Sequence, residues 1–107
     1  MERDTCLACG SLWAAIKPES LAVVAEGVAT PEEVDRIFQL SLGAPYGPFR
    51  AMDAIGLDVV LDIEEHYAAE RDGIPDAPRS LLCEYTERVR LGVMAGSGIY
   101  DDYEARV

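Results

Sequence analysis

The fold is decided around residues 26–35, which read EGVATPEEVD. Thr30 is followed by Pro31 and, three residues after the threonine, by Glu33, and this pattern is a capping box. The threonine side chain accepts a hydrogen bond from the N–H of the third helical residue, and the glutamate side chain accepts one from the threonine N–H. The proline fixes the backbone of the first turn in a helical conformation. The stretch therefore predicts that one helix ends at Gly27 and that another begins just after Thr30.

Apolar residues recur at helical spacing on both sides of this boundary. We expect a helix over residues 11–27, with either a kink or a junction of two helices near Lys17, because Pro18 removes a backbone hydrogen bond. The helix after Thr30 should end at Gly43. Its predicted buried residues are Val34, Ile37, Phe38 and Leu42, and its predicted solvent-facing residues are Glu32, Asp35 and Arg36.

The pattern predicts three more helices, over residues 48–55, 57–71 and 78–88, with a turn at 72–76. The apolar residues that recur at helical spacing in these predicted helices are Phe49, Met52, Ile55, Val59, Val60, Ile63, Tyr67, Leu81, Leu82 and Tyr85. Predicted solvent-facing residues are Asp62, Glu64, Glu65 and Glu70. Glycines interrupt residues 91–103, which should form a compact extended tail. The packed residues of this tail should be Val93, Ile99 and Tyr100.

Length and charge limit the class of protein. With 107 residues, the chain has the size of one domain, and we predict an all-α, compact bundle of about five helices with an extended glycine-rich tail. A net charge of −11 disfavours nucleic acid and anionic membranes. The longest apolar runs fall far short of the ~20 residues that span a bilayer. The acidic start of the chain is unlike a secretory signal, so we expect a cytoplasmic protein.

Few residues are candidates for chemistry. Cys6 and Cys9 form a lone Cys-x-x-Cys, which with Cys83 favours reduced thiols over a zinc or redox site. His66 is more typical of a solvent-facing helical residue than of a general base. Neighbouring acids such as Glu64 and Glu65 point about 100° apart on a helix and so do not form a carboxylate pair. Met94 and Trp13 are interpreted as core residues.

Cofactor motifs are also missing from the sequence. Residues 92–98 do not form the Gly-x-Gly-x-x-Gly fingerprint of a Rossmann domain, and no P-loop is present. We therefore predict no catalytic, cofactor-binding or metal-ligating residue in this chain.

Four segments together resemble the C-terminal domain of L-3-hydroxyacyl-CoA dehydrogenases over about residues 12–103. They read EGVATPEEVD at 26–35, GAPYGPF at 43–49, DAIGLD at 53–58 and RLGVMAGSGIY at 90–100. The resemblance implies the helical fold of the 6-phosphogluconate dehydrogenase C-terminal domain. In the full enzymes this domain follows an NAD-binding Rossmann domain, completes the acyl-CoA cleft and forms most of the dimer interface. The family's catalytic histidine and glutamate lie in the Rossmann domain, which we expect to be absent from residues 1–107.

The resemblance assigns structural roles to caps, turns and the tail. These positions are Gly27, Thr30, Pro31, Glu33, Gly43, Gly47, Pro48, Phe49, Asp53, Gly56, Asp58, Gly92, Gly96, Gly98 and Tyr100. We expect Asp53 and Asp58 to bond helix termini.

Three departures from the family pattern affect function. Gly10 and Ser11 stand where the family has Asn-Arg on the substrate side, and Met94 stands where it has lysine. Val89 replaces a helix-ending glycine, and because a β-branched residue resists positive φ we expect a different local turn.

The leading hypothesis is a stand-alone homologue of this domain, which dimerises or binds acyl-CoA in fatty-acid metabolism of the β-oxidation type. It would bind no cofactor itself, and NAD would enter through a separately encoded Rossmann chain. One alternative is half of a split NAD-dependent dehydrogenase. Another is a non-catalytic structural protein that has lost the ligand.

Overall fold

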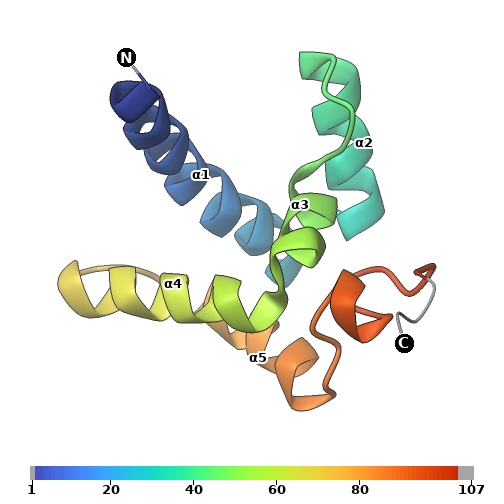
Figure 1. Ribbon diagram of the computed structural model, residues 1–107. Coiled ribbons are helices and arrows are strands. Elements are labelled where there is room, and N and C mark those ends of the chain that lie inside the picture. The colour runs from blue at the N-terminus through green and yellow to red at the C-terminus, as the bar shows by residue number, and fades with distance from the viewer. Residues whose placement is uncertain (1, 104–107) are drawn as a thin grey trace.

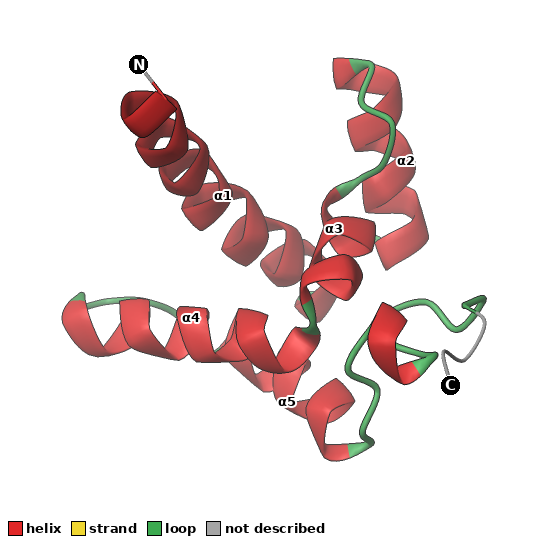
Figure 2. Cartoon of the chain, viewed as in Figure 1, coloured by secondary structure: helices red, strands yellow, loops and turns green. Residues whose placement is uncertain are grey.

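A computed structural model describes the backbone of residues 2–103 and the side chains of residues 12–103 (Figure 1). The helices within this range are α1 (Glu2–Ala25), α2 (Pro31–Leu42), α3 (Pro48–Ile55), α4 (Leu57–Glu70), α5 (Ala77–Glu87) and a short 3-10 helix, η1 (Val93–Ala95). Loops join them, and no strand forms in this part of the chain (Figure 2). The predicted all-helical class is confirmed. None of the described helices is both long and apolar enough to cross a membrane.

The capping box forms as predicted at the start of α2. The Glu33 N–H donates to the Thr30 hydroxyl at 3.2 Å, and the Thr30 N–H donates to the Glu33 carboxylate at 3.0 Å. Pro31 occupies the first turn, and Gly43 ends the helix with a left-handed φ of 64°. The boundaries of α2 therefore come from local sequence alone.

The short helix α3 lies at the centre, and α1, α2 and α4 radiate from it (Figure 1). Helix α5 packs against both α1 and α4. The core is made of apolar side chains from all of these helices except α2, together with one from the tail. They are Leu21, Phe49, Met52, Leu57, Val60, Leu82 and Ile99. The burial of Ile99 beside the half-buried Val93 and Tyr100 confirms that the tail packs on the helices.

Helix α1 corrects one prediction at its proline. It is a single helix of 24 residues with Pro18 inside it, so the alternative of two helices is wrong. Lys17, Ser20 and Leu21 are buried beside the proline, and this packing offsets the missing backbone hydrogen bond. The alternative of a kink near Lys17 stays a prediction.

Four residues that were predicted to be core are exposed: Ile37, Leu42, Ile55 and Val59. Helical spacing shows which residues share a face, whereas burial requires another element to cover that face. Helix α2 packs mainly against α3, and nothing in the described chain covers Ile37 or Leu42. Met94, also interpreted as core, is exposed because η1 lies at the surface.

Two carboxylates that were predicted to face solvent are instead buried, Asp35 on α2 and Glu64 on α4. Asp35 turns inward because it accepts hydrogen bonds from α3 and the tail. Glu64 lies where α4 meets α1 and α5, near the positive charges of Lys17 and Arg79. Both positions show that tertiary partners can place a charged residue on a helix's inner face.

Val89 keeps the turn that a glycine would make. Its φ is 56°, and it is the only described residue other than glycine with positive φ. The Arg90 N–H returns to the Tyr85 carbonyl at 2.9 Å, which closes the end of α5 in this left-handed conformation. The prediction of a different local turn is therefore wrong, because the hydrogen bonds that end the helix hold Val89 in an unfavourable conformation.

Candidate functional site

Asp35 joins three elements of the structure at one carboxylate. It comes from the middle of α2 and accepts from the backbone N–H groups of Phe49 at 2.8 Å and Arg50 at 3.1 Å, at the start of α3. The Tyr100 hydroxyl of the tail also donates to it at 2.8 Å. Gly47 provides no side-chain cap to α3, so Asp35 supplies one from another helix.

Asp53, on α3, binds the tail through its carboxylate in the same way. Its carboxylate accepts from the backbone N–H groups of Ile99 at 2.8 Å and Tyr100 at 3.0 Å, and from the Tyr103 hydroxyl at 2.7 Å. The prediction that Asp53 bonds a helix terminus is wrong, because its partners belong to the extended tail. The side chain of Asp58, at the start of α4, makes no hydrogen bond with any described residue.

Arg50 lies at the surface beside these groups and forms one cluster with Asp35, Asp53 and the tail. Its guanidinium donates two hydrogen bonds of 2.7 Å to Asp102 and lies 3.6 Å from the centre of the Tyr100 ring. The hydrogen bond from Arg50 lowers the pKa of Asp102. A bidentate pair that also stacks on an aromatic ring is a specific arrangement that lysine would not reproduce.

Glycine is required beside both buried carboxylates. A Cβ at Gly47 would collide with the backbone and side chain of Asp35, and one at Gly92 or Gly98 would collide with Asp53. These glycines of the sequence motifs therefore make room for the aspartates, and Gly92 also adopts a φ of 124°.

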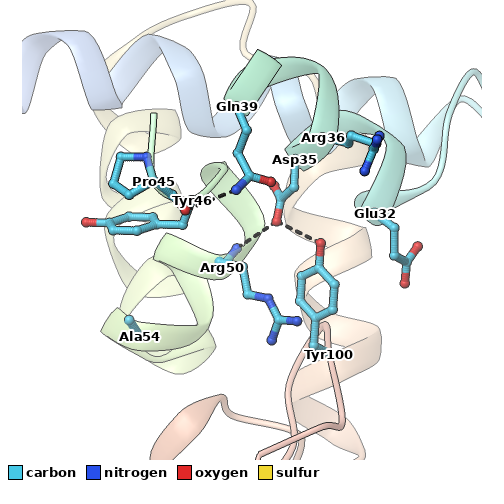
Figure 3. A pocket seen from close by; sticks show the side chains of 9 residues that line it. All are labelled: Glu32, Asp35, Arg36, Gln39, Pro45, Tyr46, Arg50, Ala54 and Tyr100. Atoms are coloured by element: carbon cyan, nitrogen blue, oxygen red, sulfur yellow. Dashed lines mark hydrogen bonds between the residues drawn. The ribbon is translucent and has the colours of Figure 1, made fainter. Parts of the chain in front are cut away.

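An open groove runs between α2 and α3 beside this cluster (Figure 3). Asp35, Arg50 and Tyr100 point into it, with Glu32 and Arg36 from α2 at one end and Tyr46 at the other. The Gln39 amide donates to the Pro45 carbonyl at 3.0 Å and so connects α2 to the loop before α3.

The hydrogen bonds of the cluster hold structural elements together. Burial, followed by the hydrogen bond to Asp35, raises the pKa of Tyr100, and burial with the bond to Asp53 raises the pKa of Tyr103. Both hydroxyls thus stay protonated at neutral pH and donate to carboxylates that already accept other bonds. The groups connect α2 to α3 and hold the tail against both helices.

Met94, one of the predicted substrate-side positions, is not among the residues that line the groove. Met94 is exposed on η1, and Gly10 and Ser11 fall within α1 but their side chains lie outside the described residues, as do those of Cys6 and Cys9. Their substrate-side role stays a prediction. His66 is exposed, as predicted, and lies 3.2 Å from Glu70. Among the described residues, no group of three or more His, Cys, Asp or Glu side chains is arranged to hold a metal.

Sequence reasoning missed Asp35, Arg50, Asp102 and Tyr103 as members of the cluster. A partial signal existed for Asp35, because on the helical wheel it falls next to Leu42, at the edge of the face that carries Val34 and Phe38. The pairing of Arg50 with Asp102 joins residues 52 apart, and no local pattern reveals it.

Comparison with known proteins identifies the family. The family model for the C-terminal domain of 3-hydroxyacyl-CoA dehydrogenase matches residues 11–102. The chain belongs to the 3-hydroxyacyl-CoA dehydrogenase family. The match includes Asp35, Asp53, the glycines that make room for them and the tail up to Asp102, so the residues drawn in Figure 3 all lie within the matched region.

Individual members of the family show the same correspondence. The probable 3-hydroxybutyryl-CoA dehydrogenases of Bacillus subtilis and Deinococcus radiodurans are each 38% identical to this chain, over 82% and 77% of it, and over 30% of their own length. The crystal structure of (S)-3-hydroxybutyryl-CoA dehydrogenase from Ralstonia eutropha superposes with a TM-score of 0.70 at 33% identity. That superposition covers 87% of this chain and 32% of the other. The chain thus spans about a third of these relatives.

Proposed function

We propose that the chain is the dimerisation and acyl-CoA-side module of a 3-hydroxyacyl-CoA dehydrogenase of fatty-acid metabolism. The observation that carries the proposal is the match over residues 11–102, a range that includes Asp35, Asp53 and the tail up to Asp102. Curated relatives in this match are described as 3-hydroxybutyryl-CoA dehydrogenases. A cytoplasmic location fits a chain whose three cysteines lack the spacing of a disulfide framework.

The exposed apolar side chains of α2 support dimerisation. Ile37 is 61% exposed, Leu40 73% and Leu42 67%, and Val28 just before the helix is 73% exposed. We call these four residues the α2 apolar surface. Ile37 and Leu40 lie on one side of the helix, and large exposed apolar side chains that share a face are typical of an interface. A second copy is the occupant we propose, because a two-fold axis lets the same surface cover itself and α2 extends away from the rest of the chain (Figure 1).

Catalysis would need an NAD-binding domain from outside these 107 residues. The chain has no Gly-x-Gly-x-x-Gly segment between a strand and a helix, and its single histidine is exposed beside Glu70. Gly10, Ser11 and Met94 replace polar or cationic residues of the family pattern, and this favours binding and assembly over a complete split enzyme. A protein that kept the fold and lost the ligand is the remaining alternative.

Calorimetric titration of the purified chain with acetoacetyl-CoA, with and without NADH, tests the binding part. Saturable heat of binding is the expected result. If no heat appears, the acyl-CoA role is wrong and the structural alternative takes its place. Robust NAD-dependent oxidation of a 3-hydroxyacyl-CoA after mixing with a Rossmann chain would instead favour the split enzyme.

Sedimentation equilibrium tests the dimer. We expect a dimer at high micromolar concentration that Leu40→Ser weakens at least tenfold, because the substitution puts a hydroxyl in place of an exposed apolar anchor. Val59→Ser removes an exposed apolar side chain from α4 and should leave the dimer intact. A strict monomer, or equal loss in both variants, would contradict the proposed interface.

A further inference from the structure

Helix α2 is attached to the domain less firmly than α1, α4 and α5. It packs extensively only against α3, whereas each of the other three packs against at least two helices. Asp35 is its one buried residue, and its apolar residues Val34 and Phe38 are only half-buried. Burial of apolar side chains is what chiefly holds a helix in a folded domain. Apolar packing therefore does little to keep α2 in place.

The two ends of α2 provide hinges. Gly27 precedes the helix with a φ of 76°, Gly43 follows it with a φ of 64°, and a side chain at either glycine would meet no atom within 4 Å. Glycines in open surroundings absorb changes of backbone angle at little steric cost. The helix between them is stiffened by the capping box of Thr30 and Glu33, whose hydrogen bonds stay within the segment. The helix can therefore turn as one body.

Asp35 ties α2 to the rest of the chain through polar contacts. Among the hydrogen bonds and ion pairs of the described residues, it is the only side chain of α2 that bonds beyond the helix and its flanking segments. Its donors are the Phe49 and Arg50 N–H groups and the Tyr100 hydroxyl (Figure 3). A helix with one buried residue and one set of tethers has the features of a unit that opens locally.

We propose that α2 is a hinged arm, which opens as one unit while the other helices stay packed, and that the Asp35 carboxylate with the Tyr100 hydroxyl is its latch. Opening withdraws Asp35 from the start of α3 and removes one wall of the groove in Figure 3. The core stays closed, because none of its buried side chains comes from α2. The motion belongs to a single chain, so it depends on neither the proposed dimer nor acyl-CoA.

Hydrogen exchange of the full chain, followed by mass spectrometry at low micromolar concentration, measures how often each helix opens. After correction for intrinsic rates, amides in residues 34–42 should exchange at least about tenfold faster than those in 60–67 and 80–86. Urea below the unfolding transition should leave the α2 rates nearly unchanged, because opening of the arm exposes little surface. The same urea should speed exchange in α4 and α5, which requires unfolding of the core.

Three variants separate the latch from the core. Tyr100→Phe should speed α2 exchange about tenfold, because it removes one hydrogen bond to the Asp35 carboxylate. Tyr85→Phe is the matched control, since this half-buried hydroxyl bonds no described residue, and α2 exchange should change less than about twofold. Leu82→Ala removes a core side chain of α5, and it should speed exchange in α4 and α5 while leaving α2 nearly unchanged.

Any of three results would overturn the proposal. They are protection of α2 equal to that of α4 and α5, equal effects of Tyr100→Phe and Tyr85→Phe on α2, and equal acceleration of α2 and α5 by Leu82→Ala. If Leu82→Ala does not fold, which circular dichroism shows, the urea series makes the same comparison in the parent chain. Calorimetry and sedimentation test the proposed module through binding and assembly, so its failure is distinct from failure of the hinged arm.

Discussion

Removing the Asp53 carboxylate should release the C-terminal tail and lower the stability of the whole domain. Asp53 is 1% exposed and accepts from two backbone N–H groups and one hydroxyl. Asp53→Ala leaves the buried N–H of Ile99 and the part-buried N–H of Tyr100 without an acceptor, at about 1–3 kcal/mol each. We therefore expect the free energy of unfolding to fall by about 2–6 kcal/mol, a large share of the ~5–15 kcal/mol of a typical domain.

Urea unfolding followed by circular dichroism measures this loss, by linear extrapolation to water. Asp53→Asn is a milder variant that keeps the shape and one acceptor oxygen, and it should lose about 1–3 kcal/mol. Asp62→Asn on the exposed face of α4 removes the same charge and should stay within about 0.5 kcal/mol of the parent chain. If Asp53→Ala loses less than ~1 kcal/mol, or no more than Asp62→Asn, the tail is not anchored through this carboxylate.

Three further changes test other parts of the structure. Tyr100→Phe removes the hydroxyl that donates to Asp35 and should cost about 1.5 kcal/mol in urea unfolding, whereas no change would mean that this bond is not formed in solution. Val89→Gly should raise stability by about 1 kcal/mol in thermal unfolding, because glycine adopts the φ of 56° without strain, and a loss would contradict this. Burial raises the pKa of Glu64, so its charged form destabilises the fold. Glu64→Gln should therefore be more stable than the parent at pH 7, and this advantage should shrink as the pH falls through the raised pKa; an advantage that grows toward acid pH would refute the assignment.

Local sequence sufficed wherever a structural feature depends on neighbours in the chain. The capping box at Thr30 and Glu33 satisfies its own hydrogen bonds within three residues, so the start of α2 could be predicted. The ends of α2 and α3 at Gly43 and Gly56 follow from their positive φ angles in the same way. The resemblance to the dehydrogenase domain also came from ordered motifs, and the family match confirms it.

The predictions of burial failed where the position of a side chain depends on residues that are distant in the sequence. Asp35 and Glu64 were placed in solvent because their charge argued for it, whereas hydrogen-bond donors from α3 and the tail draw in the first and the junction of α4 with α1 and α5 encloses the second. Ile37 was placed in the core because its spacing is right, but in the described part of the chain it is 61% exposed. Val89 is an exception, because local hydrogen bonds that end α5, from the Val89 N–H to Thr86 and from the Arg90 N–H to Tyr85, hold it at the positive φ that a β-branched residue was expected to resist.

The sequence by itself determined the helices from α2 to α5, their ends and the family, because caps, glycines and apolar periodicity act over a few residues. It did not determine that the first helix begins at Glu2 and continues through Pro18. Only the tertiary structure decided the cluster of Asp35, Asp53 and Arg50, since it joins residues 14–65 apart in the chain. Only the tertiary structure showed which apolar face of α2 is left uncovered, because burial depends on which elements meet in space.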